Sequence, residues 1–221
     1  MDLILVALII LIPLFAGIYV RTTYNSNLKI KNSENLTGYD VARKILDENG
    51  LSDLIIVETG GTLSDHYDPN RKVIRLSKDV YHGTSIASLA VAAHETGHAI
   101  QDKERYFFLK FRSLIFPIVN IVSSFSYYII LLGFILEIMN LIWIGIFATG
   151  FGIVFQIVTL PVEFNASKRA KEELKRLNLT NDRDNEGAEQ MLTAAALTYV
   201  AGVLASVLQI LRLIGIASDR N

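Results

Sequence analysis

Four long apolar blocks constrain the fold of this 221-residue chain more than any other feature. Hydrophobic residues make up 51% of the sequence, and they are concentrated in residues 3–20, 114–136, 141–160 and 193–216. A helix needs about 20 mainly apolar residues to cross a bilayer. The chain is therefore predicted to be an integral membrane protein with about four spans.

The first and last blocks each allow a second interpretation. Residues 1–20 are predicted to be a retained anchor, with a cleaved signal peptide as the alternative. Asp2 stands where a signal peptide usually carries a basic residue, and no small-x-small cleavage site precedes Arg21. The block 193–216 contains Gln209 and Arg212 near its end. Its alternative is a buried helix packed on the soluble part of the chain.

Basic residues close to the blocks predict how the chain is oriented in the membrane. They lie at both ends of segment 21–113 and within residues 168–176, which follow the third block, whereas the short turn 137–140 between two blocks has none. Loops rich in Lys and Arg usually stay in the cytoplasm. Both basic segments are therefore expected to be cytoplasmic, with the amino terminus and the tip of the hairpin on the opposite side. The basic residues are Arg21, Lys29, Lys31, Lys110, Arg112, Lys168, Arg169, Lys171, Lys175 and Arg176.

Residues 94–98 read H-E-T-G-H within an alanine-rich stretch that Ser85 can cap as a helix. On a helix, His94 and His98 lie one turn apart and can both direct a ring nitrogen at one metal ion. Glu95 then stands beside the metal, where it can accept the proton of a water that the ion activates. The pattern predicts a catalytic Zn²⁺ site with Glu95 as the base. The alternative is two packed histidines and a solvated glutamate on an ordinary helix.

A catalytic zinc needs a third protein ligand, and Glu163 is the best candidate. It directly follows the third apolar block, and the hairpin of the second and third blocks returns the chain to the side it left. Ala166, Ala170 and Leu174 follow Glu163 at helical spacing, so the carboxylate is expected to face the core. The alternative is an exposed glutamate in the first turn of a helix, stabilised by the helix dipole.

The segment between the first block and the H-E-x-x-H helix predicts a small α+β unit. Thr37 and Asp40 can cap a helix that ends at Asn49 and Gly50, and residues 54–58 and 72–76 have the character of strands. Residues 65–70 between them are predicted to be a polar turn. His66 and Tyr67 in this turn are candidates for contacts with substrate or transition state, with ordinary turn chemistry as the alternative.

These motifs together resemble the YugP-like family of membrane zinc metallopeptidases, and more distantly the gluzincin peptidases, which include HtpX-like and prenyl-protein-processing enzymes. The resemblance is carried by residues 65–69, 76–77, 94–101, 163–167 and 194–200. It implies a gluzincin-like catalytic domain, Zn²⁺ held by His94, His98 and Glu163, and Glu95 as the general base. It also implies that a strand ahead of the zinc helix pairs with an extended substrate.

One position departs from the wider gluzincin pattern. Four residues after the ligand glutamate, those enzymes often have an aspartate that orients a metal-bound histidine, and this chain has Ser167. In this chain, Asn165, Asp102 or Asp65 can be the side chain that accepts the hydrogen bond of the metal-bound histidine in place of that aspartate. The donor that stabilises the oxyanion is equally open. Its candidates are the side chains able to donate a hydrogen bond near the motifs: His66, Tyr67, His82, Arg169 and Tyr199.

The predicted fold is an α+β membrane protein, in which a helical bundle of about four spans carries a small catalytic domain with a short sheet. We expect an anchor at 1–20, a cytoplasmic catalytic segment at 21–113, a membrane hairpin at 114–160, a cytoplasmic helix carrying the third ligand at 161–192, and a membrane or membrane-associated helix at 193–216. The expected location is a bacterial cell membrane, with the active site facing the cytoplasm.

The expected activity is zinc-dependent hydrolysis of peptide bonds in membrane proteins or membrane-associated peptides. The alternatives are a catalytically inactive zinc-binding scaffold or regulator, and a small transporter. Partners other than substrate and lipid are open, since Ala148 and Gly152 can pack helices within one subunit or in a homo-oligomer. With a formal net charge of -1 and no glycine-rich phosphate loop, neither nucleic acid nor nucleotide is expected as a ligand.

Overall fold

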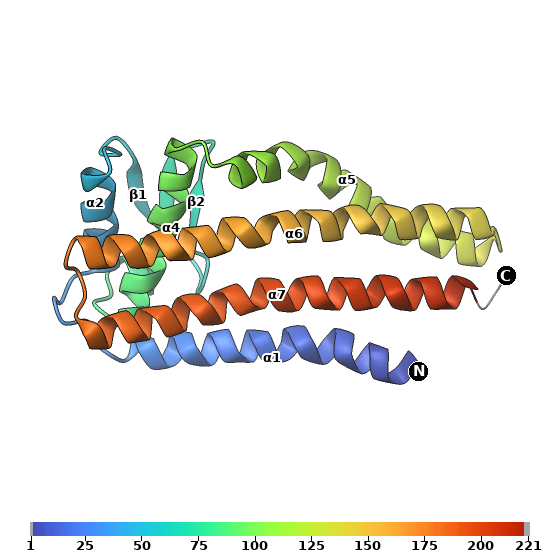
Figure 1. Cartoon of the computed structure of the whole chain (residues 1–221), viewed down its shortest axis with the longest axis horizontal. Helices are drawn as coiled ribbons and strands as arrows, with labels where there is room; N and C mark the ends of the chain where they lie inside the picture. Colours follow the sequence, from blue (N-terminus) through green and yellow to red (C-terminus); the bar gives the residue numbers. More distant parts are fainter. Residues whose placement is uncertain (1, 219–221) are drawn as a thin grey trace. The chain divides into compact units, whose positions relative to one another are not determined.

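The computed structural model describes residues 2–218, which are mostly helical (Figure 1). Among these described residues, four helices are long and apolar enough to cross a membrane: α1 (Asp2–Leu28), α5 (Phe107–Ile135), α6 (Met139–Arg176) and α7 (Asp182–Ser218). The prediction of four candidate spans is therefore confirmed. Only 17% of the most apolar window of α7 is buried, which does not fit the alternative of a buried core helix.

The chain forms two compact units. The first contains the residues up to Gly17, the segment Phe107–Pro161 and the residues from Leu197 onward, and the second contains Ile18–Tyr106 and Val162–Ala196. Helices α1, α6 and α7 each pass from one unit into the other. In α6 the apolar part and the segment with Glu163 are thus one uninterrupted helix, which includes Pro161.

The second unit is built from α2 (Gly38–Glu48), β1 (Ile55–Thr59), β2 (His66–Asp68), β3 (Val73–Ser77), α3 (Lys78–Tyr81) and α4 (Ile86–Lys103). The expected cap of α2 is present, because the Thr37 hydroxyl accepts from the Asp40 N–H and the Asp40 carboxylate accepts from the Thr37 N–H. The inner face of α2 is fully buried against α4 and the sheet, through Val41, Ile45 and Leu46.

The sheet has the strand order β1-β3-β2. Strand β3 pairs in parallel with β1 and antiparallel with β2, so β1 and β2 are its edges. The two strands expected from sequence correspond to β1 and β3.

The prediction of a turn over residues 65–70 is wrong for His66–Asp68, which form strand β2. Their backbone pairs with β3 in a register that places Tyr67 opposite Ile74. The turn is confined to the following residues, where the Asp68 carboxylate accepts the N–H groups of Asn70 and Arg71 and Lys72 has a φ of 53°. Polar side chains suggested a turn, but the backbone of this segment is free to pair, and pairing decides the structure.

Candidate metal centre

Helix α4 places His94, Glu95 and His98 together, as the sequence predicts. Its first turn is capped by Ser85, whose hydroxyl accepts the N–H of Ser88. The two histidines are separated by one turn, and the centroids of their rings are 4.8 Å apart. Both side chains are largely buried, with 15% and 12% of their surfaces exposed.

Gly97 allows α6 to approach α4 closely at the level of these histidines. A Cβ atom on Gly97 would lie 2.6 Å from the backbone oxygen of Ala166 and 3.2 Å from its Cα. Any residue larger than glycine would therefore collide with the backbone of α6. Because Glu163 precedes Ala166 by about one helical turn, this contact brings the Glu163 carboxylate to the imidazoles.

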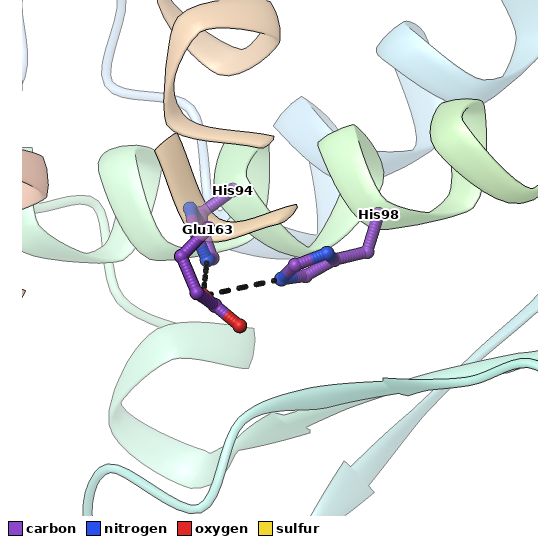
Figure 2. Close-up of side chains that lie close together, drawn as sticks. All are labelled: His94, His98 and Glu163. Carbon is purple, nitrogen blue, oxygen red and sulfur yellow. Dashed lines mark ion pairs between the residues drawn. The ribbon is translucent and has the colours of Figure 1, made fainter. Parts of the chain in front are cut away.

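Figure 2 shows the carboxylate of Glu163, from α6, directed at both histidine side chains of α4. Its Oε2 atom lies 3.3 Å from the Nε2 of His94 and 3.6 Å from the Nε2 of His98. The three donor atoms all lie within 4.8 Å of one another. The carboxylate itself is buried, with 4% of Glu163 exposed.

The spacing of these atoms fits a shared metal ion better than direct hydrogen bonds. Charge-assisted N–H to carboxylate hydrogen bonds are about 2.7–2.9 Å long, shorter than both distances. Two ligands about 2.0–2.1 Å from one tetrahedral zinc ion lie about 3.3 Å from each other. Two imidazoles and one carboxylate also form a donor set that zinc hydrolases use. The residues present therefore fit a zinc ion.

The other ring nitrogen of each histidine is bonded to a neutral side chain. The Nδ1 of His98 lies 3.0 Å from the Oε1 of Gln101, and the Nδ1 of His94 lies 3.2 Å from the hydroxyl of Ser167. A carbonyl oxygen accepts only, so the Nδ1 of His98 carries a proton and Nε2 is the ring nitrogen left to bind a metal. Ser167, four residues after Glu163, thus supplies the contact to the Nδ1 of His94.

Gln101 also joins α4 to α6. Its side chain is fully buried, and its amide donates to the carbonyl of Val162 at 2.8 Å and to the Oδ1 of Asn165 at 2.9 Å. Asn165 accepts in addition from Arg169. This role of Gln101 was not predicted from the sequence. Its position three residues after His98, on the same face of the helix, was the signal available.

The three acceptors proposed from sequence are engaged elsewhere. Asn165 bonds to Gln101 and Arg169, as described above. Asp102 accepts from the hydroxyl of Tyr67 at 2.8 Å and from the ammonium of Lys72. Asp65 accepts from the N–H and the hydroxyl of Ser77, and burial raises the pKa of its carboxyl. In the structure, the groups that contact the histidine Nδ1 atoms are Gln101 and Ser167 instead.

Glu95 is held by the edge strand of the sheet. Its Oε2 accepts the backbone N–H of Tyr67 on β2 at 2.9 Å, and only 7% of the residue is exposed. Burial raises the pKa of the Glu95 carboxyl, and the charges of His94 and His98 oppose this rise. A carboxylate with a raised pKa, fixed beside a pair of imidazoles, is a suitable proton acceptor.

Glu163 and His98 influence each other's ionisation. Burial would raise the pKa of Glu163, but the contacts with His94 and His98 outweigh burial and hold it well below its usual value. Burial would likewise lower the pKa of His98, and the contact with Glu163 and the charge of Glu95 raise it instead. The carboxylate of Glu163 is therefore ionised, as a metal ligand must be.

The remaining candidates from sequence have other partners. The ring of His66 is exposed and its Nδ1 contacts the carbonyl of Ser64, while His82 pairs with Glu58 at 2.8 Å. Arg169 bonds to Glu104 at 2.6 Å in addition to Asn165. Tyr199 lies on α7 in the other compact unit, so its role stays a prediction.

Comparison with known proteins agrees with this chemistry. Residues 2–218 match a protein family described as "putative neutral zinc metallopeptidase". The chain belongs to this family. It is also 44% identical to the "Putative membrane protease YugP" of Bacillus subtilis (strain 168), over 200 residues that cover 90% of this chain and 89% of the relative. The resemblance to the YugP-like family is thus confirmed. No solved structure matches this member of the zinc metallopeptidase family.

Proposed function

We propose that this protein is a zinc-dependent endopeptidase of the membrane, with Zn²⁺ held by His94, His98 and Glu163. The observation that carries the proposal is the separation of 3.3 Å and 3.6 Å between the Glu163 oxygen and the two imidazole nitrogens. The family membership and the four candidate spans support it. The fold of the catalytic unit is accordingly proposed to be gluzincin-like, with α4 as its H-E-x-x-H helix.

Each residue of the site has a separate role in peptide hydrolysis. Bound zinc would supply Lewis acidity toward water and toward the carbonyl oxygen of the scissile bond. Glu95 accepts a proton from the attacking water and delivers it to the leaving amine. The Tyr67 N–H holds one oxygen of Glu95, which leaves the other oxygen for this transfer. Gln101 and Ser167 fix the orientation of the two imidazole rings.

The proposed substrates are membrane proteins or membrane-associated peptides, cleaved on the cytoplasmic side. Glu163 lies on the same helix as the third apolar block and follows Pro161 by two residues. The relative from Bacillus subtilis is named a membrane protease. The basic residues next to the spans favour a cytoplasmic catalytic unit. Strand β2 presents an edge of the sheet to which an extended peptide can add.

The rival function of a transporter has less support. The first unit contains a cavity of about 370 Å³ lined by hydroxyl, amide and apolar side chains, among them Ser126, Thr149 and Gln209. No ionisable side chain lines it. Transport of ions or protons through a bilayer usually relies on such groups.

The test compares Glu95→Gln with wild type and with Glu48→Gln, which changes an exposed glutamate of α2. Membrane peptides would be inventoried by mass spectrometry in cells that carry each form, and zinc would be measured in the purified proteins. We expect all three proteins to hold one zinc ion. Glu95→Gln should lower cleavage by at least about 100-fold, whereas Glu48→Gln should leave it unchanged.

Equal peptide inventories for wild type and Glu95→Gln, with zinc bound to both, would instead support the inactive scaffold. If no zinc is found in the purified wild-type protein, the proposed metal site is refuted.

A further inference from the structure

A second cavity, of about 440 Å³, lies in the catalytic unit and is lined mainly by basic and hydroxyl side chains. Its basic residues come from two parts of the chain: Lys29 and Lys31 follow α1, and Lys78 begins α3. Thr84 and Ser85, which lead into α4, complete the lining with Leu28, Asp79, His82 and Gly83. The volume is within the usual range of small-ligand pockets.

The three ammonium groups have no counter-ion in the part of the chain that the structure describes. Neither an ion pair nor a hydrogen bond involves the Nζ of Lys29, Lys31 or Lys78 within residues 2–218, although Lys72, Lys103, Lys168 and Lys171 all have such partners. His82 at the cavity is already paired with Glu58. Asp79 is the one acidic residue of the lining. The cavity therefore has an excess of positive charge.

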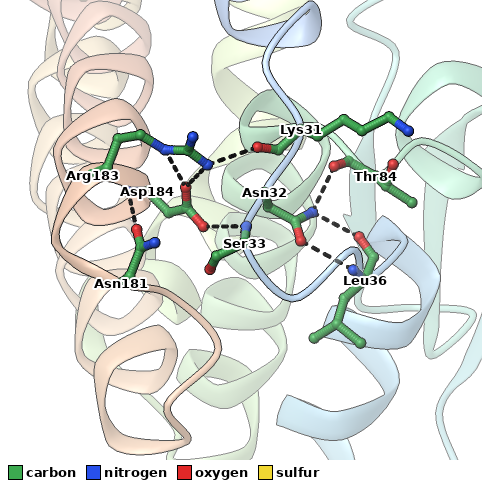
Figure 3. Close-up of polar contacts among 8 residues, drawn as sticks. All are labelled: Lys31, Asn32, Ser33, Leu36, Thr84, Asn181, Arg183 and Asp184. Carbon is green, nitrogen blue, oxygen red and sulfur yellow. Dashed lines mark hydrogen bonds and ion pairs between the residues drawn. The ribbon is translucent and has the colours of Figure 1, made fainter.

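The backbone that carries Lys29 and Lys31 is fixed along the start of α4. Lys31 forms a β-bridge with Ser85, and the Ile86 N–H donates to the Ile30 carbonyl at 2.9 Å. Figure 3 shows how the neighbouring Asn32 bonds to the Thr84 carbonyl at 2.8 Å, and how Arg183 of α7 donates to the Lys31 carbonyl.

A second set of bonds holds the same loop to the start of α7. The carboxylate of Asp184, fully buried, accepts the Ser33 N–H at 2.6 Å and is bonded to Arg183 (Figure 3). The backbone positions of Lys29 and Lys31 relative to Thr84 are thus set by the fold before any ligand binds, while their side chains are exposed. A preorganised site loses less conformational entropy on binding.

We propose that this cavity binds a phosphate group, with Lys29, Lys31 and Lys78 as its cationic contacts and Thr84 as a hydroxyl donor. Clustered lysines next to a membrane helix attract anionic phosphates, and Lys29 directly follows α1. The group can belong to an anionic lipid or to a soluble phosphate. Basic residues are common directly beside membrane spans. Lys78 is not one of these, because it belongs to α3 and not to the segment that follows α1.

The experiment uses the full-length protein in a neutral detergent. Native mass spectrometry would measure the binding of phosphatidylglycerol and of phosphatidylcholine with the same acyl chains. A second arm would titrate inorganic phosphate against chloride at equal ionic strength, followed by phosphorus NMR. The cavity variant is Lys29→Gln, Lys31→Gln and Lys78→Gln combined. The matched control replaces three exposed lysines elsewhere in the same unit: Lys44, Lys168 and Lys175.

We expect wild type and the control to prefer phosphatidylglycerol, and the cavity variant to bind it about 100-fold more weakly, since each lysine contributes about fivefold. Lys78→Gln alone should weaken binding about fivefold. Binding of inorganic phosphate without a preference for phosphatidylglycerol, lost in the cavity variant, would also support the site and assign it to a soluble ligand. Thermal unfolding of every variant would check that it is folded.

Two results would overturn the proposal. One is an equal loss of binding in the cavity variant and in the control, which would reduce the effect to overall charge. The other is wild-type affinity in Lys78→Gln, or in the folded cavity variant, for both lipid and inorganic phosphate.

Discussion

Replacement of Gly97 by alanine tests whether the close contact of α4 and α6 builds the metal site. The new Cβ would lie 2.6 Å from the backbone oxygen of Ala166, about 0.8 Å closer than the 3.4 Å at which ordinary contact begins. Because the obstacle is backbone, no side-chain rotation relieves it. The two helices must separate or shift, and Glu163 moves with α6.

The expected loss of zinc affinity follows from that displacement. A zinc site tolerates deviations of only about 0.2 Å in its ligand distances, and weaker disturbances of metal sites already cost about 10–100-fold in affinity. For Gly97→Ala we expect zinc affinity to fall by about 100-fold, at the upper end of that range. Overpacking also destabilises a fold by about 1–3 kcal/mol, but alanine favours a helix over glycine by about 1 kcal/mol. The effect on zinc should therefore exceed the effect on folding.

The assay is competition for zinc between the purified full-length protein and a chelator, combined with thermal unfolding of the zinc-free protein. The matched control is Gly150→Ala, because a Cβ at this glycine of α6 meets no atom within 4 Å. The control should bind zinc as wild type does. Wild-type zinc affinity in Gly97→Ala would refute the argument that this contact positions Glu163.

Three further predictions follow from the same contacts. Gln101→Leu removes the acceptor of the His98 Nδ1–H and should lower zinc affinity about 10–100-fold in the chelator assay. Removal of zinc should destabilise the wild type by about 4 kcal/mol when free zinc is about 1,000 times its dissociation constant, and Glu163→Ala should be insensitive to the chelator. Asp184→Ala removes a fully buried carboxylate that accepts the Ser33 N–H, and the loss of this charge-assisted hydrogen bond should lower stability by about 1–3 kcal/mol in thermal unfolding, with zinc affinity unchanged.

The features that could be predicted from sequence are local ones. The cap of α2 depends on Thr37 and Asp40, which are three residues apart, and the pairing of His94 with His98 depends on one helical turn. The four candidate spans depend on composition alone. Such signals are complete within a short window, so they do not require knowledge of the tertiary structure.

Other features depend on how distant segments meet. Glu163 could be proposed because the predicted membrane hairpin would return the chain, but its final position depends on the contact of Gly97 with Ala166, which are 69 residues apart in sequence. The contact of Ser167 with His94 depends on the same approach. Strand β2 was missed because its polar side chains favour a turn, whereas its structure is decided by pairing with β3.

The side chains that orient the two imidazoles, Ser167 and Gln101, are neutral, and this suits a site that already contains two carboxylates. Glu95 and Glu163 place two carboxylates in a buried region, with 7% and 4% of these residues exposed. One divalent cation balances two carboxylates, and a buried charge without such balance is costly. An aspartate in place of Ser167, which is itself 8% exposed, would add a third negative charge. The hydroxyl of Ser167 and the amide of Gln101 can orient the rings without that addition, so Glu95 can remain ionised and able to accept a proton.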